Sequence, residues 1–258
     1  MHRALITGGT AGIGAAFATS FARRGVPVVL VARDAARLEE FAAALRSQHG
    51  IEVETIVADL EDRDAQQRVA DRLASDVDPV DVLVNNAGFS VRASLLAEDL
   101  SEHDRGFEVM VRAVLKLGGA AGRAMSRRGR GWIINVGSVS ALVTQNNYSA
   151  IKAWVGNYSE SLGVQLAGTG VTVTALMPGW VRTEFHSRAG IKGSSIPDFL
   201  WLEADQLVEE CLRDVAKGQP VSVPSLRWKL IAAVLRGTPR GLVARLSAIL
   251  SHRRSKER

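Results

Sequence analysis

The feature that most constrains this chain is a regular alternation of short apolar runs with longer segments of helical periodicity. The runs are rich in β-branched residues and apolar on both faces, which is typical of parallel strands covered by helices on both sides. Seven runs have this character: "ALITGG", "PVVLVAR", "VETIVADL", "DVLVNNAG", "WIINVGS", "VTVTALMPG" and "PVSVP". Segments with apolar residues three and four apart lie between them, at residues 14–24, 35–48, 65–75, 104–125, 148–167 and 204–216. This order predicts an α/β fold with a doubly wound parallel sheet of about seven strands.

Length and charge indicate how the sheet is organised into domains. The chain has 258 residues, 47% of them apolar, and can bury a substantial core. No low-complexity linker or repeat divides it, so we predict one domain at 1–225 and a C-terminal helical extension at 226–258. The extension has nine Lys or Arg and one acid, a balance of +8, so the other 225 residues carry 5 − 8 = −3 of the net charge of +5. The basic character therefore belongs to the extension.

Several classes of site and partner are excluded at this stage. Cys211 is the single cysteine and the five histidines are scattered, so we expect no disulfide and no metal site. The domain is slightly acidic and has no recognition motif, which excludes nucleic acid as a partner. The first strand-like run begins at Arg3 and no apolar stretch approaches the length of a membrane span, so we expect a cytoplasmic protein.

A glycine-rich turn follows the first predicted strand. The sequence "TGGTAGIG" places Gly8, Gly12 and Gly14 at the start of a helix. Backbone N–H groups and the positive end of the helix dipole meet at such a turn, which suits a pyrophosphate. A tight strand-to-helix connection without a ligand is the alternative. Within a strand–helix–strand unit the turn predicts a Rossmann-type dinucleotide site.

The end of the second predicted strand favours NADP over NAD. An NAD-binding unit places an acid about 20 residues past the glycines, where it holds a ribose hydroxyl. This chain has Ala32 and Arg33 there, and a guanidinium forms bidentate hydrogen bonds with a 2′-phosphate. The alternative is that Arg33 is a solvated charge and that Asp34 caps the next helix or binds the ribose.

Residues 146–154, "NNYSAIKAW", carry a phenol and an ammonium four residues apart. Side chains at this spacing share one face of a helix, so Tyr148 and Lys152 can serve one small volume. The alternative is a half-buried aromatic residue beside a solvated lysine.

Taken in order, these motifs resemble the classical short-chain dehydrogenase/reductase family over nearly the whole chain, to about Val223. The glycine turn is followed by "ADL" at 58–60, "NNAG" at 85–88, Ser138 after a strand, "YSAIK" at 148–152 and "PGWVRT" at 178–183. Tyr158 has no lysine four residues on, so the resemblance assigns the tyrosine of the motif to Tyr148.

The resemblance implies an NADP-dependent oxidoreductase in which Ser138 polarises the substrate oxygen, Tyr148 is the general acid or base and Lys152 binds the nicotinamide ribose. It implies cofactor contacts from Gly8, Thr10, Gly12, Ile13, Gly14, Arg33, Asp59, Leu60, Asn86, Ala87, Gly88, Tyr148, Lys152, Pro178, Gly179, Val181 and Thr183. A phenol has a pKa near 10, and we expect a nearby ammonium and the positive nicotinamide to lower it. Ser138 could instead satisfy backbone groups at a strand end, with Ser140 as its substitute, and Asp59 could be a helix-start residue.

Two departures from the family pattern concern the catalytic residues. Met110 stands where the family usually has an asparagine, and the interval from Ser138 to Tyr148 is shorter than usual. The family role of that asparagine depends partly on its main-chain carbonyl, which methionine retains, so we expect a modified proton relay. The competing hypothesis is a catalytically weak, NADP-binding regulatory or scaffold protein.

Large apolar residues suggest an apolar ketone or 3-oxoacyl-type substrate, although core packing is the alternative for each of Trp180, Phe185, Phe199 and Trp201. The resemblance implies a mobile substrate lid at residues 185–201, and a homodimer or homotetramer formed through the long helices.

The spacing of apolar residues in the extension predicts two short amphipathic helices. Their apolar stripes are Leu226, Leu230, Ile231, Val234 and Leu235, and, after Thr238 and Pro239, Leu242, Val243, Leu246, Ile249 and Leu250. Packing on the domain or on a second subunit is one interpretation. Contact with a membrane surface, as in a lipid-pathway reductase, is the other.

Overall fold

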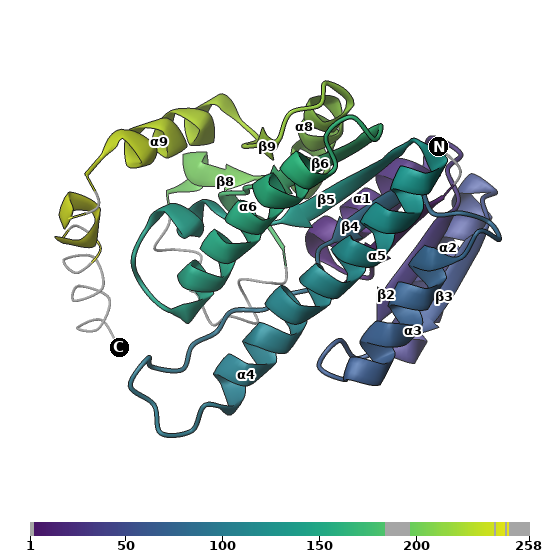
Figure 1. Cartoon of the computed structure of the whole chain (residues 1–258), viewed down its shortest axis with the longest axis horizontal. Coiled ribbons are helices and arrows are strands. Elements are labelled where there is room, and N and C mark those ends of the chain that lie inside the picture. Colours follow the sequence, from purple (N-terminus) through teal and green to yellow (C-terminus); the bar gives the residue numbers. More distant parts are fainter. Residues whose placement is uncertain (1–2, 184–196, 240, 246, 248–258) are drawn as a thin grey trace.

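The computed structural model describes residues 3–183, 197–239, 241–245 and 247, and it confirms the predicted Rossmann-type α/β fold (Figure 1). Seven parallel strands form one sheet in the order β3-β2-β1-β4-β5-β6-β9. They are β1 Ala4–Thr7, β2 Val28–Ala32, β3 Val53–Val57, β4 Val82–Asn85, β5 Gly131–Val136, β6 Val171–Leu176 and β9 Val221–Ser222. The strand order reverses between β1 and β4, which is where doubly wound sheets bind their ligands.

Helices cover both faces of the sheet and divide the core in two. On one face are α1 Gly12–Ala22, α2 Ala35–His49 and α8 Ala204–Ala216, which bury Phe17, Leu38 and Leu207. On the other are α3 Arg63–Ala74, α4 Ser101–Phe107, α5 Ala113–Arg128 and α6 Asn147–Gln165. Because every interior strand faces helices on both sides, the strands are apolar throughout.

The helical segment predicted at 104–125 contains a π-turn. The chain runs from α4 through η1, a π-helical turn at Glu108–Arg112, into α5 without a break. A π-turn inserts one residue and leaves the apolar spacing almost unchanged on either side, so periodicity does not reveal it.

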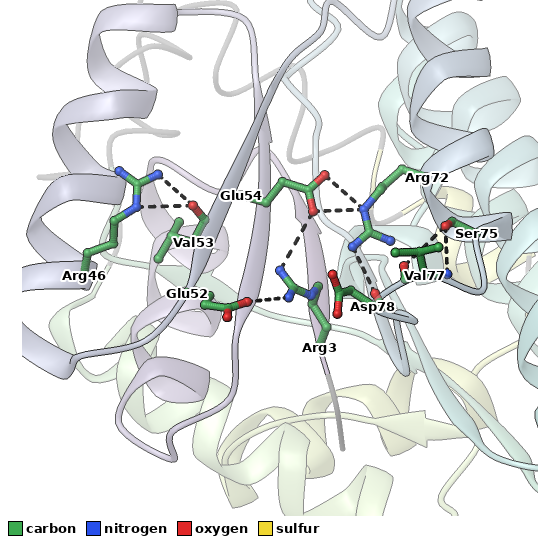
Figure 2. A network of polar contacts seen from close by, with 9 residues as sticks. All are labelled: Arg3, Arg46, Glu52, Val53, Glu54, Arg72, Ser75, Val77 and Asp78. Carbon is green, nitrogen blue, oxygen red and sulfur yellow. Dashed lines mark hydrogen bonds and ion pairs between the residues drawn. The ribbon is translucent and has the colours of Figure 1, made fainter.

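A polar network joins the amino ends of the strands, as Figure 2 shows. Arg3, just before β1, donates to Glu52 at 2.7 Å, and Arg72 of α3 donates to Glu54 of β3 at 2.9 Å. Arg46 of α2 donates to the carbonyl oxygen of Val53 at 2.7 Å. These contacts hold α2 and α3 against the amino end of β3, whereas the glycine turn lies at the carboxyl ends of the strands.

The C-terminal helix α9, Leu226–Gly237, lies at one end of the molecule (Figure 1). A two-stranded sheet of β7 Trp180–Val181 and β8 Trp201–Leu202 stands beside it, with the 3₁₀ turns η2 Val139–Leu142 and η4 Asp198–Leu200. No helix within the described ranges is long and apolar enough to cross a bilayer. Phe185, most of the predicted lid, and Leu246, Ile249 and Leu250 lie outside the described residues.

Candidate active site

A cavity of about 790 Å³ lies at the carboxyl ends of β1 to β6. It is lined by seventeen of the residues predicted from the sequence: Gly8, Thr10, Gly12, Ile13, Arg33, Asp59, Leu60, Asn86, Ala87, Gly88, Ser138, Tyr148, Lys152, Pro178, Gly179, Val181 and Thr183. Gly14 is the predicted residue that does not line it. A side chain on Gly14 would overlap the carbonyl oxygen of Gly8, so Gly14 serves the close packing of the turn.

The glycine turn has a backbone that side chains would disturb. Gly8 and Gly12 have φ values of +63° and +52°, a region that favours glycine. A Cβ on Gly12 would lie 3.1 Å from the Cβ of Thr183, so the turn closely approaches the segment after β6. The bare backbone at the start of α1 fits the pyrophosphate of a dinucleotide.

Thr7 and Asn86 brace this turn against β4. The backbone N–H groups of Asn86 and Ala87 each donate to Thr7 Oγ1 at 3.0 Å. In return, Asn86 Nδ2 donates to the carbonyl oxygens of Thr7, at 2.9 Å, and Gly8, at 3.1 Å. The "NNAG" segment therefore fixes the turn through both its backbone and its side chain.

Charged side chains of both signs surround the end of the cavity at β2 and β3, where the sequence predicts the adenosine. Asp34 caps α2 by accepting from the N–H of Arg37 at 3.0 Å, and both residues line the cavity with Arg33. The Arg33 guanidinium lies 3.8 Å from the Asp59 carboxylate and 3.5 Å from that of Glu61. Arg33 is thus a lining cation, and the predicted capping role of Asp34 is present beside it.

Ser138, Tyr148 and Lys152 meet at the carboxyl end of β5. Ser138 accepts the N–H of Ser140 at 3.1 Å and also forms a side-chain hydrogen bond with Tyr148. The backbone-satisfying role and the tyrosine-facing role of Ser138 therefore coexist. Lys152 Nζ donates to the carbonyl oxygen of Val136 at 2.7 Å and lies 5.6 Å from the centre of the Tyr148 ring.

Burial shifts the pKa of both titrating groups in the direction that favours the uncharged form. It raises the pKa of the Tyr148 phenol well above its usual range, and the hydrogen bond with Ser138 opposes this rise. Burial lowers the pKa of the Lys152 ammonium to about 8. For the phenol, burial outweighs the hydrogen bond with Ser138. The lowering that we expected concerns Lys152 and a nicotinamide together, and it stays a prediction.

A buried ladder of amides holds α6 against the sheet. Asn85 Nδ2 donates to Asn135 Oδ1 at 2.9 Å, and Asn135 Nδ2 donates to Ser159 Oγ at 3.0 Å. Ser159 then donates to the carbonyl oxygen of Val155 at 2.6 Å. The ladder links β4, β5 and α6, and so fixes the helix that carries Tyr148 and Lys152.

Met110 lies in the π-turn, fully buried, and does not line the cavity. A Cβ on Gly88 would lie 3.1 Å from its sulfur, so Met110 packs directly behind the "NNAG" segment. The thioether fills apolar space behind the site and offers no amide to it.

Several lining residues were not predicted from the sequence, among them Arg37, Trp228 and Leu235. Arg37 lies one helical turn past Arg33, a spacing that could have identified it. Trp228 and Leu235 belong to α9, and no local signal relates them to the cavity. Trp180 lines the cavity, whereas Phe199 and Trp201 do not, because Trp201 packs against Trp180 and Phe199 is exposed.

Comparison with known proteins agrees with this geometry. Residues 2–192 match the family described as short chain dehydrogenase. Gluconate 5-dehydrogenase of Gluconobacter oxydans is 34% identical over 189 residues, which are 72% of this chain and 73% of that enzyme. A short-chain dehydrogenase from Sphingobium yanoikuyae, solved in complex with NADPH, is 34% identical with a TM-score of 0.82, covering 92% of this chain and 94% of that one. The bulky-bulky ketone specific alcohol dehydrogenase from Comamonas testosteroni is 30% identical with a TM-score of 0.79, covering 92% and 93%. The chain therefore belongs to the short-chain dehydrogenase/reductase family and is an NAD(P)-dependent oxidoreductase.

Proposed function

We propose that this protein is an NADP-dependent reductase of an apolar ketone or 3-oxoacyl-type carbonyl, with Ser138, Tyr148 and Lys152 as its catalytic residues. The observation that carries the proposal is the meeting of these three side chains at one end of the cavity. A reduced nicotinamide, when bound, supplies a hydride. The residues predicted to hold it, apart from Gly14, line the same cavity.

Each catalytic residue has a role that follows from its surroundings. A phenol with the ordinary pKa near 10 is protonated at neutral pH, and burial raises the pKa of Tyr148 further, so Tyr148 can deliver a proton to a carbonyl oxygen as a general acid. Ser138 is a neutral donor to the same oxygen. Because the pKa of Lys152 is about 8, its ammonium is charged at pH 7 and stabilises the phenolate left after proton transfer.

Support for an apolar substrate comes from the cavity walls. Phe89, Val109, Trp180, Trp228 and Leu235 all line the cavity. The structural neighbour named for bulky ketones points the same way, whereas the relative named for gluconate acts on a polar substrate. The apolar walls of this chain's own cavity are the observation that supports an apolar substrate.

The test is NADPH consumption with a panel of short and bulky ketones, aldehydes and 3-oxoacyl thioesters. We expect turnover of bulky or acyl carbonyls, and a loss of at least about a hundredfold, or about 3 kcal/mol, in Tyr148→Phe. Tyr158→Phe is the matched control and should retain activity. Turnover that survives Tyr148→Phe would refute the mechanism, and NADPH binding without any turnover would favour the scaffold hypothesis.

Arg33 and Arg37 support the preference for NADP, and Glu61 opposes it. Two guanidiniums suit a 2′-phosphate, while the Glu61 carboxylate competes for Arg33. Cofactor affinities measured by nucleotide fluorescence would test this. Arg33→Ala should weaken NADPH binding about tenfold or more and leave NADH unchanged, and Glu61→Gln should strengthen NADPH binding. Equal loss for both cofactors in Arg33→Ala would contradict the assignment.

We further propose a homo-oligomer that pairs through α5 and α6. Leu115 of α5 and Val164 of α6 are exposed apolar side chains on these long helices. Helices that expose apolar residues on an otherwise solvated face are typical of subunit contacts.

A further inference from the structure

The outer surface of α9 presents an apolar stripe that nothing within the described residues covers. Leu226, Leu230 and Val234 are four residues apart and have exposed fractions of 73%, 60% and 68%. They follow one line along the helix. Leu242, in the short segment after Pro239, is also half exposed and extends the apolar surface.

The opposite side of α9 is firmly attached to the domain. Trp228 and Ala232 are buried in the core, and Trp228 Nε1 donates to the carbonyl oxygen of Leu200 at 3.0 Å. The Arg227 guanidinium donates to the carbonyl oxygen of Phe199. The helix is therefore held in place by one side while it exposes three large aliphatic side chains on the other.

The charged side chains that the extension itself places beside the stripe are basic, whereas Glu210 of α8 lies beside Leu226 and Arg227 at its start. Arg227, Lys229, Arg236 and Arg245 are all exposed, and the sequence from 226 to 256 contains no acid. The extension carries +8 and the rest of the chain −3, so the charge asymmetry of the whole molecule favours an anionic surface facing α9.

We infer that α9 docks on an anionic membrane surface, with Leu226, Leu230 and Val234 inserted between lipid headgroups and the flanking cations on their phosphates. An amphipathic helix with basic flanks binds an interface in this way. A second copy of the chain fits poorly, because two such stripes would bring Arg227, Lys229 and Arg236 against identical cations. The stripe is also far smaller than a stable interface, which involves about 20–30 residues on each side.

The inner side of α9 faces the cavity, so membrane docking would bring the cavity close to the lipid. This step rests on the proposed function. Trp228 and Leu235 line the cavity, so α9 separates the cavity from the docked surface by the thickness of one helix. The substrate class favoured by this arrangement is a carbonyl compound that partitions into lipid.

The test is flotation of the full-length protein with vesicles of phosphatidylcholine alone and with about a third phosphatidylglycerol, at low and high salt. We expect binding to the anionic vesicles that falls with salt. The variant L226Q/L230Q/V234Q, which keeps every charge, should bind at least tenfold more weakly. The matched control L95Q/L96Q changes two exposed leucines in the loop before α4 and should bind as the native protein does.

Three outcomes would overturn the inference: no flotation with anionic vesicles, equal binding to neutral vesicles, or unchanged binding of the triple variant. A change in oligomeric mass of the triple variant without lipid would assign the stripe to a second copy. Tyr148→Phe should float like the native protein, so the failure of the proposed reaction and the failure of membrane docking give different results.

Discussion

Burial is the largest cause of the pKa shift of both titrating residues of the site. It raises the pKa of Tyr148 and lowers the pKa of Lys152. The phenol of Tyr148 becomes harder to deprotonate and the ammonium of Lys152 becomes easier to deprotonate. Both shifts favour the neutral form, because removal from water penalises a charge. The charged Lys152 therefore has a cost in stability as well as a use in catalysis.

That cost predicts a specific pH dependence of stability. The pKa of Lys152 is about 8 in the folded protein against an ordinary value of 10.5. Between these values the unfolded chain binds the proton that the folded protein has lost, so the free energy of unfolding rises with pH. Between pH 7 and pH 10, urea denaturation of the native protein should gain about 2–3 kcal/mol relative to Lys152→Met. Identical pH slopes for the two proteins would contradict the shift.

Met110→Asn tests whether the lack of the asparagine that the family usually has at this position lowers the activity. An asparagine there would bury an amide in apolar surroundings behind Gly88, and an unsatisfied amide costs about 1–3 kcal/mol. We expect the denaturation midpoint to fall, with kcat within about tenfold of the native value. Met110→Leu is the control, since it keeps the volume and should cost less than about 1.5 kcal/mol. A large gain in kcat would show that the native proton relay is broken.

At the scale of elements, the site depends on how α9 meets the turn after β6. The N-terminal part of α9 places the indole of Trp228 directly on Gly179, within hydrogen-bond reach of Leu200. The predicted nicotinamide-binding turn and the C-terminal helix are thus packed as one unit. The boundary predicted at residue 225 remains a prediction, with α9 packed on the domain beyond it.

A double-mutant cycle can measure this packing. A Cβ on Gly179 would overlap the Trp228 ring, so Gly179→Ala should destabilise the protein by about 1–3 kcal/mol. Trp228→Leu removes the overlapping ring, and the double variant should be more stable than the sum of the two single changes by about 0.5 kcal/mol or more. Strict additivity in urea denaturation would show that the two residues do not contact each other.

At the scale of the whole molecule, two groups of exposed apolar residues lie on surfaces of different charge. The stripe on α9 has four cations of the extension along it and Glu210 of α8 at its start, whereas Leu115 of α5 has Lys116 and the Glu108 carboxylate of η1 near it in sequence. Mixed charge permits a self-complementary contact, and charge of one sign opposes it. This difference in charge supports our proposals of self-association through α5 and α6 and of lipid contact through α9.

Leu115→Arg should dissociate the proposed oligomer. Light scattering after size exclusion should then report the monomer mass of 27.7 kDa instead of a multiple of it. Leu96→Arg, in the exposed loop before α4, is the control and should keep the native mass. An unchanged mass for Leu115→Arg would place the subunit contact elsewhere.

The sequence by itself determined the sheet, its helices and most of the predicted residues that line the cavity. Strand and helix periodicities are local. The glycine turn, Arg33 and "NNAG" each lie at the end of a strand, and "YSAIK" lies in the first turns of the helix after β5. Because all the strands are parallel, their carboxyl ends share one edge, and motifs far apart in the chain must meet there. This is why nearly every predicted residue lines one cavity.

Tertiary structure alone decided the parts of the site that depend on packing between distant segments. The pairing of Arg33 with Glu61, the π-turn that buries Met110 and the contact of Trp228 with Gly179 have no local pattern. Burial also set the directions of the two pKa shifts, and burial is a property of everything that surrounds a side chain. Periodicity shows which face of α9 is apolar, whereas only the packed structure shows that Trp228 is buried and Leu226, Leu230 and Val234 are exposed.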